Sequence, residues 1–232
     1  MVIHTMKLDP EPFAQIREGW KTIELRLYDE KRRKLQIGDT ILFENRRSAE
    51  ILNTRVTGLW VFDSFAALYE KLPLLECGYT EETVAAAGPE DMDAYYSPED
   101  QRKYGVVGIG LAPKPVWIAK ATEKPWEIAA LAGRMWDHPV AELTEEFSEL
   151  LARSDAAVFT ARQGAELLGF AQCQLRQDYV EGTETSPVGY LEGIFTQEGC
   201  RKQGIAASLL RACEAWARSR GCMSILVMPG IL

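Results

Sequence analysis

Residues 189–206 read GYLEGIFTQEGCRKQGIA, and this stretch decides the fold of the second half of the chain. Residues 189–196 are apolar, aromatic and β-branched, a composition that predicts a strand. A polar turn, two cations (Arg201 and Lys202) and Gly204 follow, and the next run, AASLLRACEAWARSR, favours a helix. Small residues at a helix start let a ligand approach backbone N–H groups that have no partner inside the helix. We therefore predict a strand that leads directly into a diphosphate-binding loop.

The spacing Arg201-x-x-Gly204-x-Ala206 after a strand resembles the acetyl-CoA pyrophosphate loop of the GNAT acyltransferases. The run RQDYVEGTETSPVGYLEG at 176–193 is similar to the corresponding run of aminoglycoside 6'-N-acetyltransferases, and the similarity covers roughly residues 115–222. This resemblance implies a mixed sheet with flanking helices. It also implies acetyl-CoA as the co-substrate and an aminoglycoside, or another polyamine-like small molecule, as the acceptor.

The resemblance also implies particular site residues. The pantetheine and the thioester oxygen would be bound by the strand residues Ile194, Phe195 and Thr196. The diphosphate would be held by Arg201, Lys202, Gln203, Gly204, Ile205 and Ala206. Substrate-binding candidates are Trp136, Asp178, Glu181 and Glu184. The three acids would form an acidic cleft, which concentrates a polycation. The alternative for these loop acids, a solvated surface turn, stays open. The catalytic candidates are Tyr179 and Glu192, of which Glu192 would take the amine's proton through a water.

The sequence of the first half of the chain predicts short strands and two helices. A helix over 11–19 ends at Gly19, and a helix over 64–72 begins at Ser64. Strands are predicted over 22–29, 40–45, 55–62 and 106–111, with a Gly38-Asp39 turn before the second strand. Acidic, proline-bearing loops are expected between the second helix and the last strand. This pattern favours a small mixed barrel.

Residues 6–43, MKLDPEPFAQIREGWKTIELRLYDEKRRKLQIGDTILF, resemble an ASCH domain, a PUA-like barrel linked to RNA binding and, in some members, to hydrolysis. The resemblance covers roughly residues 1–111 and implies RNA or a modified nucleoside as a partner. Its implied cleft contains Lys21, Thr22, Glu24 and Arg26. Strand alternation separates Lys21 from the face of Glu24 and Arg26, but we expect Lys21, at the strand start, to turn into the same cleft.

Three hypotheses stay open for that cleft. The first is hydrolysis, because similar small bacterial members hydrolyse N4-acetylcytidine with a lysine, a threonine and a glutamate. Lys21 matches the lysine, but Glu24 stands where the threonine is expected, which argues against hydrolysis. The second hypothesis is nucleic-acid or nucleotide binding. The third is a structural ion pair of Glu24 and Arg26 on a surface strand.

We predict a two-domain chain, α+β followed by α/β, with a PUA-like domain over 1–112, a linker at 113–115 and a GNAT domain over 116–232. The linker follows from Ala112-Pro113-Lys114-Pro115, which cannot continue a strand ladder. The residues after about 222 depart from the family, so we expect a truncated sheet, impaired acetyl transfer and an exposed sheet edge through which the chain could dimerise. The alternative function is an RNA- or nucleotide-binding ASCH protein with a non-catalytic GNAT remnant.

The composition of the chain limits the classes of function that it can have. The net charge of −8 argues against a broad nucleic-acid surface. Apolar runs are too short for a membrane span, and the first residues lack an apolar signal core, so we expect a cytoplasmic protein. The five cysteines and two histidines show no zinc-like spacing, and we expect no metal.

Overall fold

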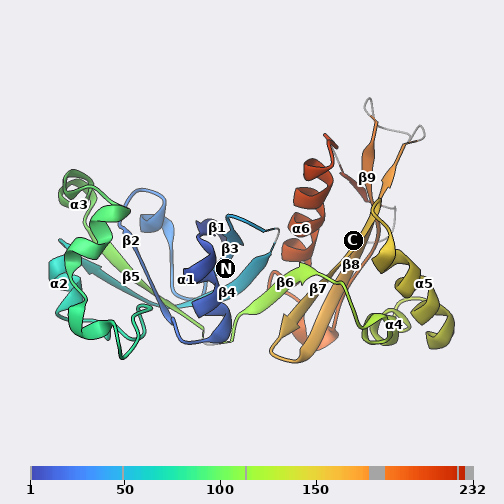
Figure 1. Ribbon diagram of the computed structural model, residues 1–232, viewed down its shortest axis with the longest axis horizontal. Coiled ribbons are helices and arrows are strands. Elements are labelled where there is room, and N and C mark those ends of the chain that lie inside the picture. The colour runs from blue at the N-terminus through green and yellow to red at the C-terminus, as the bar shows by residue number, and fades with distance from the viewer. Residues whose placement is uncertain (1, 49, 113, 178–185, 224, 228–232) are drawn as a thin grey trace. The chain divides into compact units, whose positions relative to one another are not determined.

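The computed structural model describes residues 2–48, 50–112, 114–177, 186–223 and 225–227 (Figure 1). The chain forms two compact units, and the two-domain fold class is confirmed. Unit 1 comprises Met1–Phe43 and Thr54–Pro115, and unit 2 comprises Glu44–Asn53 and Val116–Leu232. Residues 44–53, which the sequence placed in the first domain, therefore pack with the second unit.

Unit 1 is built on strands that pair in the order β1-β3-β4-β5-β2. The β4–β5 and β5–β2 pairs are antiparallel. Its core includes Ile23 and Leu25 of β2 together with Phe65 and Leu68 of α2. The elements are β1 (Ile3–Leu8), α1 (Pro10–Glu18), β2 (Ile23–Leu27), η1 (Arg32–Lys34), β3 (Thr40–Asn45), β4 (Ile51–Phe62), α2 (Phe65–Tyr69), η2 (Val84–Ala86), η3 (Pro89–Ala94), α3 (Pro98–Tyr104) and β5 (Val106–Leu111).

Several helix boundaries in unit 1 follow from local signals. Gly19 ends α1 with a φ of 88°, and Ser64 caps α2 by accepting a hydrogen bond from the Ala67 N–H at 3.3 Å. The prediction of loops throughout 73–105 was wrong at α3. Ser97 caps α3 by accepting from the Asp100 N–H at 3.1 Å, and Pro98 occupies its first turn. These residues are typical of a helix start and were the signal that could have revealed it.

Unit 2 is a sheet in which the start of β4 is followed by β6, β7, β8, β9 and β10. Pairing is antiparallel up to β9, and β10 runs parallel to β9. The elements are β6 (Val116–Lys120), α4 (Pro125–Ala132), α5 (Val140–Ala152), β7 (Ala156–Gln163), β8 (Glu166–Arg176), β9 (Val188–Thr196), η4 (Glu198–Cys200), α6 (Ile205–Ser219) and β10 (Ile225–Val227).

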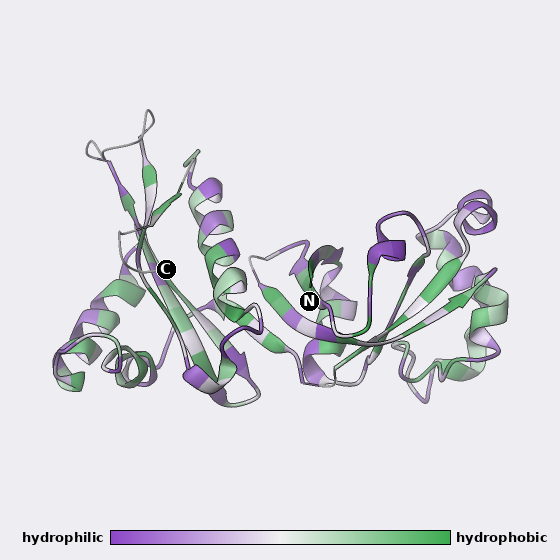
Figure 2. Cartoon of the chain, turned by 180° about the vertical axis from the view of Figure 1, so that it is seen from behind, coloured by the Kyte–Doolittle hydropathy of each residue, from purple (hydrophilic) through white to green (hydrophobic). Residues whose placement is uncertain are grey.

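The helices of unit 2 cover both faces of this sheet, with α6 on one face and α4 and α5 on the other (Figure 1). Val158 and Phe170 of the sheet pack with Phe147 of α5 and with α4. Figure 2 shows hydrophobic residues concentrated along the strands between these helices. This packing fixes the position of β9 and of the turn that leads from β9 into α6. Within the described ranges, no helix has the length and apolar character that crossing a membrane requires.

Candidate functional site

The end of β9 offers backbone groups to a ligand. On one side β9 pairs with β8 as far as Thr196, opposite Gly169. On the other side β10 pairs only with residues 189–191 among the residues described. Those amides of 192–196 that point away from β8 consequently have no strand partner in this part of the structure. The Thr196 hydroxyl oxygen is also buried there without a hydrogen-bond partner among the described residues.

The turn after β9 carries a run of backbone N–H groups that have no backbone partner among the described residues. Lys202 and Gly204 both adopt left-handed conformations, with φ of 61° and 80°. Residues 202–207 donate no backbone hydrogen bond to any other described residue. Left-handed residues beside a helix start aim successive N–H groups at one region, a geometry that binds anions. The predicted start of the helix after Gly204 is confirmed.

Two cations accompany these amides. The Arg201 Nε donates to the carbonyl of Thr196 at 3.3 Å, which links the turn to the last residue of β9. Lys202 is exposed beside it. The predicted diphosphate-binding residues 201–206 are thus contiguous with the free end of β9.

Two residues that were not predicted from the sequence form hydrogen bonds with the carbonyl groups of this turn. The Ser208 hydroxyl donates to the Gly204 carbonyl at 2.9 Å. The Asn53 Nδ2 lies 3.2 Å from the Gln203 carbonyl oxygen and 3.1 Å from the Ser208 Oγ. Ser208 could have been found as the fourth residue after Gly204. Asn53 comes from β4, far away in sequence, and carried no local signal.

Glu192 lies at a β-bulge in β9, because Gly193 pairs with Gln172 while Leu191 pairs with Cys173. Its Oε1 accepts from a guanidinium nitrogen of Arg176 at 2.8 Å, and its side chain is 15% exposed. The hydrogen bond to Glu192 raises the pKa of Arg176, whose guanidinium also lies 3.8 Å from the ring centre of Tyr190. Arg176 and Tyr190 were not among the predicted site residues.

The remaining substrate-side predictions have different outcomes. Trp136 is half-buried and packs on Phe147 and Phe170, so much of its ring belongs to the core between α5 and β8. The other four predicted residues lie outside the described residues: Asp178, Tyr179, Glu181 and Glu184.

In unit 1 the structure brings three predicted residues together. The Lys21 Nζ lies 3.4 Å from Glu24 Oε2, and the Arg26 Nε lies 2.8 Å from Glu24 Oε1. The expected turn of Lys21 toward Glu24 is therefore present. Thr22 points elsewhere, because its hydroxyl donates to Glu76 at 2.7 Å.

This cluster of Lys21, Glu24 and Arg26 is buried rather than on a surface strand. The Lys21 and Glu24 residues are 7% and 5% exposed. Lys21 also donates to the Cys77 carbonyl. Burial raises the pKa of the Cys77 thiol to about 11, although the positive charge of Lys21 lowers that pKa. Two cations and one carboxylate give the cluster a net positive charge, so it fits an anionic or carbonyl-bearing group better than a cation.

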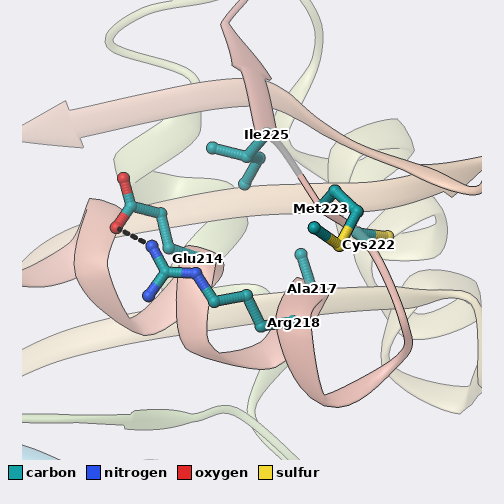
Figure 3. A pocket seen from close by; sticks show the side chains of 6 residues that line it. All are labelled: Glu214, Ala217, Arg218, Cys222, Met223 and Ile225. Carbon is teal, nitrogen blue, oxygen red and sulfur yellow. Dashed lines mark hydrogen bonds and ion pairs between the residues drawn. The ribbon is translucent and has the colours of Figure 1, made fainter. Parts of the chain in front are cut away.

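A cavity of about 220 Å³ lies between the C-terminal half of α6 and β10 (Figure 3). Glu214 and Arg218 form an ion pair at 3.3 Å along its rim, and Cys222 and Met223 line it. None of the predicted site residues lines this cavity. It lies at the opposite end of α6 from the turn of residues 201–206.

Two family models match this chain. The model described as the acetyltransferase (GNAT) family matches residues 120–230, and the model described as the ASCH domain matches residues 6–115. The chain is 44% identical to an aminoglycoside N(6')-acetyltransferase type 1 from Stenotrophomonas maltophilia, over 50% of this chain and 75% of that protein. It is 35% identical to a protein of the same name from Acinetobacter haemolyticus, over 45% of this chain and 70% of that protein.

Among solved structures, aminoglycoside acetyltransferase AAC(6')-Iy in complex with a bisubstrate analogue matches with 30% identity and a TM-score of 0.46. That match covers 49% of this chain and 80% of the other. The chain belongs to the GNAT acetyltransferase family and carries an ASCH domain ahead of its GNAT domain.

Proposed function

We propose that the GNAT domain transfers the acetyl group of acetyl-CoA to the 6'-amine of an aminoglycoside. The observation that carries this proposal is the juncture of β9 and α6, where two left-handed residues, Lys202 and Gly204, precede the first turn of a helix. Relatives named aminoglycoside N(6')-acetyltransferases supply the acceptor class.

Acetyl-CoA fits the groups that the turn presents. The amides of 202–207 and the cations Arg201 and Lys202 would bind the diphosphate oxygens. The outward amides of Ile194 and Thr196 lie further along the same strand, where they would bind the pantetheine and the thioester carbonyl. The unpartnered Thr196 hydroxyl oxygen adds a polar group to this surface. In this assignment two sets of amides divide the work: those at the end of β9 bind the thioester end of acetyl-CoA, and those of 202–207 bind its diphosphate.

Acetyl transfer requires an uncharged amine held in line with a polarised thioester. The amine nitrogen forms a bond to the acetyl carbon, the carbon–sulfur bond breaks, and CoA leaves as a thiolate that takes up a proton from water. Glu192 would receive the amine's proton through a water, because its carboxylate lies on β9 two residues before Ile194. Backbone N–H groups at the end of β9 would stabilise the negative charge that develops on the thioester oxygen.

The pairing of Arg176 with Glu192 suits a cationic acceptor. Without substrate, the guanidinium neutralises the carboxylate at 2.8 Å. An aminoglycoside ammonium group would compete with Arg176 for that carboxylate, since both are cations. Arg176 would then keep its contact with the ring of Tyr190 and release Glu192. Glu192 would contact the incoming amine.

A turnover assay tests this function. The full chain is incubated with acetyl-CoA and one of two aminoglycosides, of which one bears a 6'-amine and the other a 6'-hydroxyl group. CoA thiol release with the amine and none above background with the hydroxyl compound supports the proposal. Release with neither compound argues against it.

A second function is favoured by the buried cluster of Lys21, Glu24 and Arg26. Burying three ionisable side chains together is unfavourable without other benefit, and such clusters are frequent at binding sites. We propose that the ASCH domain binds RNA or a modified nucleoside there, with Lys21 and Arg26 contacting a carbonyl or phosphate.

Equilibrium binding of short single-stranded RNA by the full chain tests this second function. Lys21→Ala and Arg26→Ala should each weaken binding, and affinity should fall only modestly with salt because few phosphates can be contacted. Unchanged binding in the double variant would place the RNA site elsewhere in the protein.

A further inference from the structure

Asn53 contacts the carbonyl side of the diphosphate-binding turn with both N–H groups of its amide. Its Nδ2 lies 3.2 Å from the Gln203 carbonyl oxygen and 3.1 Å from the Ser208 Oγ. The Ser208 hydroxyl already donates to the Gly204 carbonyl. Both neighbours of Asn53 therefore act as acceptors, which requires the NH₂ group of its amide to face them.

The position of Asn53 is fixed by the sheet of unit 2. Residues 51–53 pair antiparallel with 116–118 of β6, with Asn53 opposite Val116. The Trp117 Nε1 donates to Glu50 Oε1 at 3.1 Å, a second link between this segment and β6. Asn53 is 6% exposed, so its amide is held between the sheet and the start of α6.

Peptide geometry transmits this contact to the face that would bind phosphate. In a planar trans peptide, the C=O and the following N–H point in opposite directions. Holding the Gln203 carbonyl therefore orients the Gly204 N–H, and holding the Gly204 carbonyl through Ser208 orients the Ile205 N–H. Both N–H groups then point away from Asn53, toward the concave side of the turn.

We propose that Asn53 is a positioning residue for acetyl-CoA: it orients the amides of the 203–205 turn toward the diphosphate. This inference rests on the proposed acetyl-CoA function of the GNAT domain. It assigns part of the cofactor site to residues 44–53, which lie outside the GNAT match over 120–230. Asn53 itself does not touch the ligand and acts through Gln203 and Ser208.

The test compares two acetyl donors, acetyl-CoA and acetyl-pantetheine, of which the second lacks the diphosphate. Binding and turnover of both are measured for the wild-type full chain and for Asn53→Ala. We expect the Kd and KM for acetyl-CoA to rise about tenfold, from loss of two hydrogen bonds. The values for acetyl-pantetheine and for the aminoglycoside should stay unchanged.

Asn45→Ala is the matched control. Asn45 lies on the same segment, and its side-chain amide lies 3.5 Å from Glu50 Oε2. The Asn45→Ala substitution should leave the Kd and KM of both acetyl donors unchanged. If Asn53→Ala does not fold, Ser208→Ala tests the same link, since alanine favours a helix and removes the hydroxyl that joins Asn53 to Gly204. Ser208→Ala should show the same selective loss for acetyl-CoA.

Each remaining outcome overturns the inference. Equally weakened binding of both acetyl donors would show that Asn53 supports the fold in general. Wild-type affinities in Asn53→Ala and Ser208→Ala would show that the contact does not position the turn. In either case the proposed function stands. A wild-type chain that neither binds nor uses acetyl-CoA would overturn the proposed function and this inference together.

Discussion

The indole ring of Trp136 lies directly against the backbone of Gly193, where an added Cβ would come within 2.7 Å of the Trp136 Cζ2. Gly193 follows Glu192 on β9, so this contact joins the hydrophobic core to the strand that carries the candidate base. Trp136 also packs on Phe147 and Phe170, with ring centres 6.3 and 5.8 Å away. The ring cannot move away from β9 without disturbing that core.

Gly193→Ala should therefore destabilise the protein by about 1–3 kcal/mol, the range for overpacking a filled core. Chemical denaturation of the full chain measures the change. Gly199→Ala is the control, because a Cβ there meets nothing within 4 Å, and its effect should stay within about 0.5 kcal/mol. Equal stability of the two variants would contradict the packing of Trp136 on Gly193.

Glu192→Gln should lower kcat about hundredfold, the lower range for loss of a general base, while the KM for acetyl-CoA stays unchanged. The amide keeps the shape of the side chain but cannot accept a proton at neutral pH. Glu166→Gln, at an exposed position on neighbouring β8, is the control and should retain full activity. Wild-type kcat in Glu192→Gln would assign the proton transfer to another group.

Gly204→Val should abolish acetyl-CoA binding, because a β-branched residue is strained at a φ of 80° and its side chain would lie in the turn that we propose binds the diphosphate. Gly221→Val is a close control. Gly221 follows the other end of α6 with a φ of 87° and has open space around its missing side chain. Calorimetric titration should show binding by the Gly221 variant alone, whereas loss in both would indicate general unfolding of α6.

Asp39 provides a pH-dependent contribution to the stability of the ASCH domain. Hydrogen bonds from the Val2 N–H and from His4 hold the pKa of Asp39 below its ordinary value. A depressed carboxylate pKa stabilises the folded state above the unfolded pKa, near 4, and this contribution is lost as pH falls through the folded value. Asp39→Asn should thus be less stable at neutral pH by about 1–3 kcal/mol, with the difference shrinking below about pH 4.

Denaturant titrations at neutral and acidic pH measure that difference. Asp63→Asn, at an exposed position in the same unit, should match the wild-type chain at every pH. A constant difference between wild type and Asp39→Asn across the acidic range would contradict the assigned cause.

Local signals in the sequence predicted the strand, the turn at Gly204 and the helix that follows, because these features are determined by nearby residues. The proximity of Lys21 to Glu24 was also expected, since Lys21 precedes the strand and is free to turn. The roles of Asn53 and Arg176 could not be predicted. Asn53 depends on the pairing of β4 with β6, and Arg176 depends on the register of β8 against β9, both of which tertiary packing decides.

The burial of particular side chains depends on tertiary packing as well. The hypothesis of a Glu24–Arg26 ion pair on a surface strand was correct for the ion pair, which is present at 2.8 Å, and wrong for its location, because Glu24 is 5% exposed. Alternation identifies which residues share a face, but it does not reveal which later elements cover that face. The same limit applies to Trp136, whose ring is partly enclosed by α5 and β8.

The most direct measurement of the central claim uses acetyl-CoA labelled with a heavy isotope in the acetyl carbonyl, a 6'-amino aminoglycoside and the full chain. Nuclear magnetic resonance of the product locates the labelled group. We predict a single labelled amide at the 6' nitrogen, formed by the wild-type chain and absent with Gly204→Val. Label that stays on CoA, or label at another amine, would contradict the proposed 6'-N-acetyltransferase function.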